Sequence, residues 1–154
     1  MAAPRYAYED FRPGDRAEYG GLIVERDEML AFAREFDPQP MHLSEEAARA
    51  SMLGELIASG WQTAALAMRM HCDQWLADST SLGSPGVDSL EWLRPVKAGD
   101  RLSVLSEVLA ARVSASRPDR GIVTFRFEVV NQHGDIVLRQ VGPILFGRRN
   151  AEAA

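Results

Sequence analysis

The feature that most constrains the fold is a helical pattern over residues 61–77, the longest apolar helical pattern in the chain. Its first half is apolar almost all round and rich in alanine. A helix on a protein surface keeps a polar face, so a helix that is apolar on most sides is buried. We expect other elements to wrap around it. The stripe expected to face the core consists of Trp61, Ala64, Ala65, Met68, Cys72, Trp75 and Leu76.

Beyond this helix the pattern changes to that of β-strands. Strands are predicted over residues 87–96, 102–112, 122–130 and 136–146, and an earlier one over 16–25. In residues 122–130, Val123, Phe125, Phe127 and Val129 alternate onto one face, and residues 131–135 form a hairpin turn. Strands joined by short turns pair antiparallel. The sequence therefore predicts an α+β fold, an antiparallel β-sheet wrapped around one long central α-helix.

Composition indicates an ordinary globular protein. We expect the 154 residues to form one domain, and 46% hydrophobic with 25% charged residues is typical of a folded chain. A net charge of −5 disfavours nucleic acid and anionic membranes as partners. The first residues have no apolar run, so no secretory signal is expected, and the most apolar run, residues 56–70, is predicted to be too polar to span a bilayer. A single cysteine, Cys72, excludes an internal disulfide, so a cytoplasmic location is expected.

Just before the long helix lies a short segment that carries an acid and an imidazole, Asp37 and His42. A helix beginning at Asp27 as N-cap is expected to end at or just before Asp37, because Pro38 follows. With Pro38 and Pro40, residues 36–42 are predicted to form a rigid, non-helical loop. Ser44 is then expected to cap a short helix over residues 45–51.

Two interpretations of these residues stay open on chemistry alone. Asp37 and His42 either perform acid–base chemistry beside an apolar pocket, or satisfy nearby backbone groups. Likewise, Ser59 either caps the long helix, or precedes free N–H groups at Gly60 that hold a carbonyl oxygen as it gains negative charge.

The remaining candidates favour plainer interpretations. His71 is expected to be buried or at an interface, His133 to be solvated in a turn, and Cys72 to be a small core residue. Arg148 and Arg149 are expected at the surface. The histidines and the cysteine lack metal-ligand spacing, and the chain has no phosphate-binding loop and no nucleophile-elbow motif.

Three segments resemble one family. The first segment, residues 37–42, is similar to the D-x-N-P-x-H segment of the MaoC-like, or R-specific enoyl-CoA hydratase, group of hotdog-fold proteins. Ala48 matches a small residue later in that motif. Residues 56–61 resemble the entry to the family's central helix, and residues 93–100 resemble the strand and turn after it. The resemblance extends in order over nearly the whole chain. The residues of the first segment are Asp37, Pro38, Gln39, Pro40, Met41 and His42.

The resemblance implies a hotdog fold, a homodimer or higher homo-oligomer, and a hydratase or dehydratase acting on an acyl-CoA or related thioester. Asp37 and His42 would hold the water, and the Gly60 N–H would bind the thioester oxygen, with Ser59 and Gln39 also at the substrate site. Asp37 is the favoured base, although the sequence does not separate its role from that of His42. No metal or redox cofactor is expected, since the CoA thioester is the substrate.

The chain departs from the family pattern at three places. Gln39 replaces an asparagine, Ser59 replaces a histidine, and the pair Glu35 and Phe36 replaces a small residue and a glycine. Two alternative functions therefore remain. One is a hotdog acyl-CoA thioesterase, which would release a free thiol. The other is a non-catalytic subunit that binds an acyl thioester.

Overall fold

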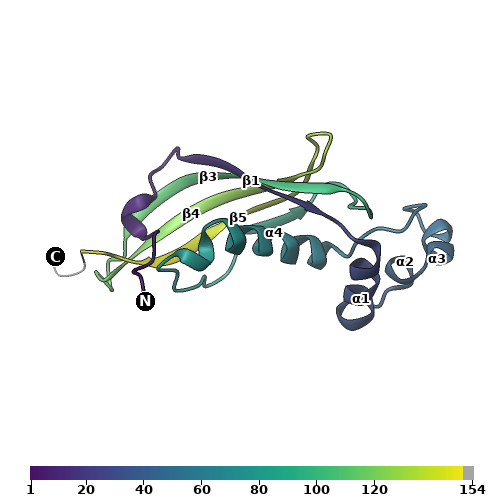
Figure 1. Cartoon of the computed structure of the whole chain (residues 1–154), viewed down its shortest axis with the longest axis horizontal. Helices are drawn as coiled ribbons and strands as arrows, with labels where there is room; N and C mark the ends of the chain where they lie inside the picture. The colour runs from purple at the N-terminus through teal and green to yellow at the C-terminus, as the bar shows by residue number, and fades with distance from the viewer. Residues whose placement is uncertain (151–154) are drawn as a thin grey trace.

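The sheet and the helix against it dominate the computed structural model, which describes residues 1–150 (Figure 1). Five antiparallel strands lie in the order β1-β3-β4-β5-β2. The predicted fold class is confirmed. The strands are β1 (Arg16–Ile23), β2 (Ser89–Trp92), β3 (Arg101–Val113), β4 (Arg120–Val130) and β5 (Ile136–Gly147). The helices are α1 (Arg26–Phe36), α2 (Pro40–Leu43), α3 (Glu45–Ala50) and α4 (Gly60–Gln74), with short 3₁₀ turns η1 (Tyr8–Asp10) and η2 (Leu76–Asp78).

The inner face of the sheet forms the core. Along β4, Val123, Phe125, Phe127 and Val129 are all buried, as their alternation predicts. The hairpin between β4 and β5 is also confirmed, since the N–H of Asn131 donates to the carbonyl of Asp135. Strand periodicity was a sufficient guide here because the face of β4 that carries these four residues packs into the core.

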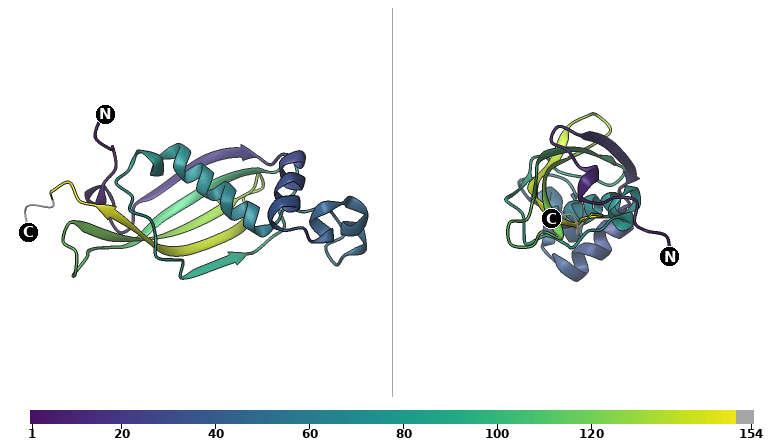
Figure 2. Two further views of the ribbon diagram at one scale, coloured as in Figure 1. Left: turned by 90° about the horizontal axis from the view of Figure 1, so that it is seen from below. Right: turned by 90° about the vertical axis from the view of Figure 1, so that its left-hand side faces the viewer.

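Helix α4 lies against one face of the sheet, as Figure 2 shows. The prediction of its buried stripe was right in part, since Trp75 is buried and Ala64 and Leu76 pack against the core. The residues it buries are Gln62, Thr63, Ala67, Met70 and His71, whereas Trp61 and Met68 are 59% and 46% exposed. The sheet covers only one side of the helix, and an apolar residue on the other side stays exposed in the single chain. A helix that is apolar on most sides does not indicate which side the sheet will cover.

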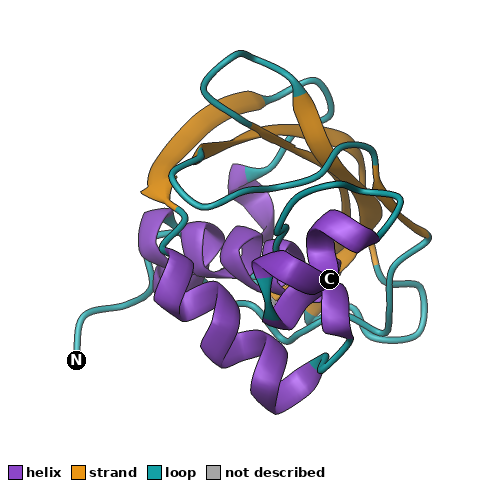
Figure 3. Ribbon diagram, turned by 90° about the vertical axis from the view of Figure 1, so that its right-hand side faces the viewer, coloured by secondary structure: helices purple, strands orange, loops and turns teal. Residues whose placement is uncertain are grey.

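Helices α1, α2 and α3 lie together beyond one end of α4, on the side of the molecule seen in Figure 3. Helix α1 begins at Arg26 with Glu25 as N-cap, so the prediction of Asp27 as N-cap was wrong, but the helix ends before Asp37 as predicted. The loop prediction over residues 36–42 was wrong in part, because Pro40 starts the one-turn helix α2. Proline is favoured in the first turn of a helix, where its missing N–H costs nothing. Ser44 caps α3 as predicted, accepting from the N–H of Ala47 at 3.1 Å.

A buried polar network fixes α4 to the sheet. The indole N–H of Trp75 donates to the Tyr19 hydroxyl at 3.1 Å, and that hydroxyl lies 2.9 Å from Nδ1 of His71. Because an indole can only donate, the hydroxyl accepts from Trp75 and donates its own proton to His71. His71 is 2% exposed, as the sequence led us to expect, and burial lowers its pKa from 6.5 to about 4. The histidine is therefore neutral in the folded protein near neutral pH.

None of the helices within residues 1–150 is long and apolar enough to cross a membrane.

Replacing His71 by glutamine should remove part of the acid sensitivity of the fold. In wild type the unfolded chain protonates this histidine below its ordinary pKa of 6.5, whereas the folded chain does so only near pH 4. The free energy of unfolding therefore falls as the pH drops through this window, by up to about 3 kcal/mol. Urea unfolding of both proteins at about pH 7 and about pH 4.5 measures the difference. Equal acid losses in wild type and His71→Gln would contradict a buried neutral histidine.

Candidate active site

The end of α1 and the short helix α2 position an acid and an imidazole. Asp37 follows the last residue of α1, and its N–H donates to the carbonyl of Ala33 at 3.0 Å. His42 lies in α2, is 5% exposed, and has Nδ1 3.0 Å from the carbonyl oxygen of Ile57. The imidazole is thus held by the segment that leads into α4.

Three groups surround the carboxylate of Asp37. The hydroxyl of Ser59 donates to Oδ2 at 2.6 Å, and the amide of Gln39 donates to Oδ1 at 2.7 Å. Nε2 of His42 lies 3.5 Å from Oδ2. The bond from Ser59 and then that from Gln39 hold the pKa of the Asp37 carboxyl below its ordinary value, against an opposing effect of burial. Asp37 is therefore ionised at neutral pH.

The proton positions follow from the partners. A carbonyl oxygen only accepts, so Nδ1 of His42 carries the proton that it donates to Ile57. In the neutral ring Nε2 is then an acceptor, and it faces Asp37 Oδ2, which is also an acceptor. A water molecule to one side of the two atoms could donate one O–H to each. Such a water would keep the lone pairs of its oxygen free to attack a substrate.

Gly60 is the first residue of α4. It directly follows Ser59, whose hydroxyl binds Asp37, so the start of the helix lies close to the acid. The first N–H groups of a helix have no partner inside the helix, and they attract negative charge. The capping interpretation of Ser59 was wrong, because its side chain makes no bond to the helix start and donates to Asp37 instead. The expected substrate-site residues Asp37, His42, Ser59, Gln39 and Gly60 are thus brought together by the fold, with Ser59 and Gln39 bound to Asp37.

Trp92, in β2, also belongs to the site, although the sequence gave no signal for it. Its indole N–H donates to the carbonyl of Gly60 at 2.7 Å. A Cβ atom on residue 60 would lie 2.6 Å from the indole nitrogen, closer than real Cβ contacts. Residue 60 is therefore a glycine because Trp92 packs directly on its Cα. This contact joins residues 32 positions apart in the sequence, and local patterns do not reveal it.

A cavity of about 260 Å³ opens beside these groups. Asp37 is not one of the residues that line it, so His42 is the member of the pair that the cavity exposes. The cavity is lined by polar groups from α2 and α4 and by apolar side chains from the segments before α4 and after β2. The residues that line it are His42, Leu53, Ile57, Ala58, Gly60, Thr63, Trp92, Leu93, Arg94, Pro95 and Val96.

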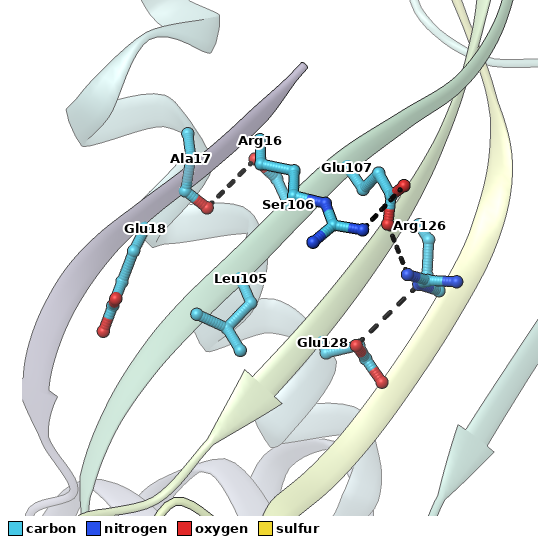
Figure 4. A pocket seen from close by; sticks show the side chains of 8 residues that line it. All are labelled: Arg16, Ala17, Glu18, Leu105, Ser106, Glu107, Arg126 and Glu128. Carbon is cyan, nitrogen blue, oxygen red and sulfur yellow. Dashed lines mark hydrogen bonds and ion pairs between the residues drawn. The ribbon is translucent and has the colours of Figure 1, made fainter. Parts of the chain in front are cut away.

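A wider hollow of about 420 Å³ lies on the outer face of the sheet (Figure 4). Four of its charged side chains form a chain of ion pairs: Glu107 pairs with Arg16 at 3.4 Å and also with Arg126, which lies 3.8 Å from Glu128. None of the five expected site residues lines it.

The other titratable candidates lie apart from the cavity. His71 is in the Tyr19 network, His133 is exposed as predicted, and Cys72 is half-buried, so its assignment to the core was only partly right. Arg149, expected at the surface, is 43% exposed by side chain and pairs with Asp10. Over residues 1–150, no group of three or more His, Cys, Asp or Glu side chains is placed to hold a metal ion.

An antiparallel sheet packed against one long helix defines the hotdog fold. The sequence profile described as "MaoC like domain" matches residues 12–129. The chain therefore belongs to the MaoC-like domain family. Membership supports hydratase or dehydratase chemistry in general.

Three relatives illustrate the match. A MaoC-like dehydratase from Rhodospirillum rubrum has 45% identity and a TM-score of 0.86, over 93% of this chain and 97% of that chain. The R-hydratase PhaJ1 from Pseudomonas aeruginosa has 31% identity and a TM-score of 0.68, over 93% and 86%. The uncharacterized protein YdeM of Bacillus subtilis (strain 168) is 30% identical over 124 residues, which are 80% of this chain and 86% of the relative.

Replacing Gly60 by alanine should displace Trp92 from the helix start. The added methyl group would overlap the indole, which is 44% exposed and free to swing outward. Loss of the bond to the Gly60 carbonyl should lower the free energy of unfolding by about 1 kcal/mol, with a red shift of tryptophan fluorescence. In a Trp92→Ala background the same substitution should cost much less, and a double-mutant cycle measures this difference. Equal costs in both backgrounds would show that Trp92 does not require the glycine.

Proposed function

We propose that this protein adds water to, or removes it from, an α,β-unsaturated or 3-hydroxy acyl thioester, with coenzyme A as the thiol. One observation carries the proposal. Two hydrogen-bond acceptors, Asp37 Oδ2 and His42 Nε2, lie 3.5 Å apart beside a cavity that also contains the start of α4. This arrangement suits a water molecule held next to a polarised carbonyl group.

In the proposed hydration, the Gly60 N–H binds the thioester oxygen, and the water oxygen forms a bond to the β-carbon. The π electrons move toward the thioester oxygen and give an enolate-like group. One proton of the water passes to Asp37, which is already ionised, and the hydroxyl group remains on the β-carbon. Dehydration follows the same steps in reverse.

The proton then returns to the α-carbon and restores the thioester carbonyl. His42 Nε2 is 3.5 Å from the Asp37 carboxylate and lines the cavity, so we assign to it the transfer of the proton from Asp37 to the substrate. An acid–base group contributes about 10²–10⁴-fold to rate, and one oxyanion donor contributes about 10²–10³-fold.

No redox cofactor enters this proposal, because hydration transfers protons and hydroxide without net electron transfer, and none of the proposed steps uses a metal ion. The single cysteine favours a reducing compartment, so we place the protein in the cytoplasm.

Replacing Asp37 by asparagine should reduce kcat for hydration by about 10²–10⁴-fold, because the amide cannot accept a proton. The assay follows loss of the conjugated thioester across enoyl-CoA chain lengths. Glu35→Gln is the matched control, since Glu35 is an exposed acid two residues away, and it should retain wild-type activity.

Three results would contradict the proposal. The first is that Asp37→Asn is as active as wild type. The second is that a thiol-trapping reagent detects free CoA while the double bond persists, which indicates a thioesterase. The third is that enoyl-CoA raises the melting temperature but is never converted, which indicates a binding subunit.

We further propose that the protein is a homodimer. In the order of the sheet β2 is an edge strand, and edge strands present unpaired backbone groups. Apolar side chains are exposed beside it: Trp61 (59%), Trp92 (44%) and Leu93 (42%), with the two indole rings 4.9 Å apart. Met68 (46%) lies on the same helix as Trp61. A second copy of the chain, pairing through β2 and α4, would cover these residues.

Replacing Met68 by glutamate should break the dimer, because a charge would be buried without a partner. Sedimentation at micromolar concentration should give the mass of two chains for wild type and of one chain for the variant. Leu105→Glu is the control, since Leu105 is 37% exposed in the hollow of the outer face, and it should remain dimeric. A monomeric wild-type protein would contradict the assignment.

A further inference from the structure

Arg94 is the one arginine or lysine among the residues that line the cavity of the candidate active site. It follows β2 by two residues, is exposed, and lines the same cavity as His42 and Gly60. In the part of the chain that the structure describes, no carboxylate forms an ion pair with it. Its charge is therefore available to a ligand.

The neighbouring basic residues, unlike Arg94, form ion pairs with carboxylates. Lys97 pairs with Glu55 at 2.8 Å, and Glu45 pairs with Arg26 at 3.2 Å and with Arg49 at 3.6 Å. These charges are neutralised outside the cavity, in an adjacent hollow of about 300 Å³. Arg94 alone adds positive charge to the lining of the candidate site, because His42 is the only other titratable residue there.

We propose that Arg94 binds a carboxylate on the acyl group, so that the substrate is the thioester of an unsaturated or hydroxylated dicarboxylic acid. This rests on the proposed function, whose substrate class it narrows. The guanidinium group offers two parallel N–H donors that match a carboxylate, and such charge-assisted bonds are strong ones. Trp92, Leu93 and Pro95 line the cavity beside it.

The place of Arg94 favours an acyl carboxylate over a phosphate of coenzyme A as its ligand. The phosphates of coenzyme A lie at the far end of the pantetheine arm from the thioester. Arg94 shares its cavity with the groups proposed to bind the thioester, which places it near the acyl end.

Binding of two saturated thioesters, which cannot be hydrated, tests this inference without turnover. Glutaryl-CoA and valeryl-CoA both have five-carbon acyl chains, but only the first ends in a carboxylate. Calorimetry should show that wild type binds glutaryl-CoA about tenfold or more tightly than valeryl-CoA. Arg94→Gln should lose this preference by weakening glutaryl-CoA alone. Arg112→Gln, an exposed arginine on β3, is the control and should retain the preference.

Each other outcome overturns the inference. Equal affinity of wild type for the two thioesters, or binding of neither, would show that the acyl carboxylate is not recognised. An equal loss for both thioesters in Arg94→Gln would assign the residue to a phosphate of coenzyme A. The proposed function fails separately: in that case the glutaryl-CoA preference persists, while no enoyl-CoA, with or without a carboxylate, is converted.

Discussion

The carboxylate of Asp37 links the segment between α1 and α2 to the start of α4, and the candidate site depends on this link. It follows α1, and it accepts from Ser59 at the start of α4 at 2.6 Å and from Gln39 before α2 at 2.7 Å. The carbonyl of Ile57 holds His42 in the same way at 3.0 Å. Because α4 is packed on the sheet, these bonds fix the acid and the imidazole relative to the core. Preorganisation of this kind is what acid–base catalysis requires.

The departures from the family pattern acquire a physical meaning from these contacts. Ser59 replaces a histidine, and its hydroxyl donates to the acid and contributes most to lowering the pKa of Asp37. Gln39 replaces an asparagine and donates to the other carboxylate oxygen. Both residues thus keep Asp37 ionised and oriented. A carboxylate with two such donors is a weak base, so the transfer of its proton to a neighbour is favourable once it has been protonated.

Features set by residues close together in the sequence could be predicted, and contacts between residues far apart in the sequence could not. The strands were predictable because their alternation is local, as Val123 to Val129 in β4 show. The side of α4 that faces the sheet was not predictable, since the helix buries the polar Gln62 and Thr63 and leaves Trp61 exposed. The contact of Trp92 with Gly60 and the bond of Ser59 to Asp37 join distant segments, and only the fold reveals them. The roles expected of Asp37, His42 and Gly60 came from the family resemblance.

The central claim is that Asp37, His42 and the Gly60 N–H act on a single thioester. A crystal structure with a bound 3-hydroxyacyl-CoA tests it most directly. The account predicts that the thioester oxygen accepts from the Gly60 N–H, and that the 3-hydroxyl group lies within hydrogen-bond distance of Asp37 Oδ2 and His42 Nε2. A hydroxyl group remote from both side chains, or a thioester bound outside the cavity at the start of α4, would contradict it.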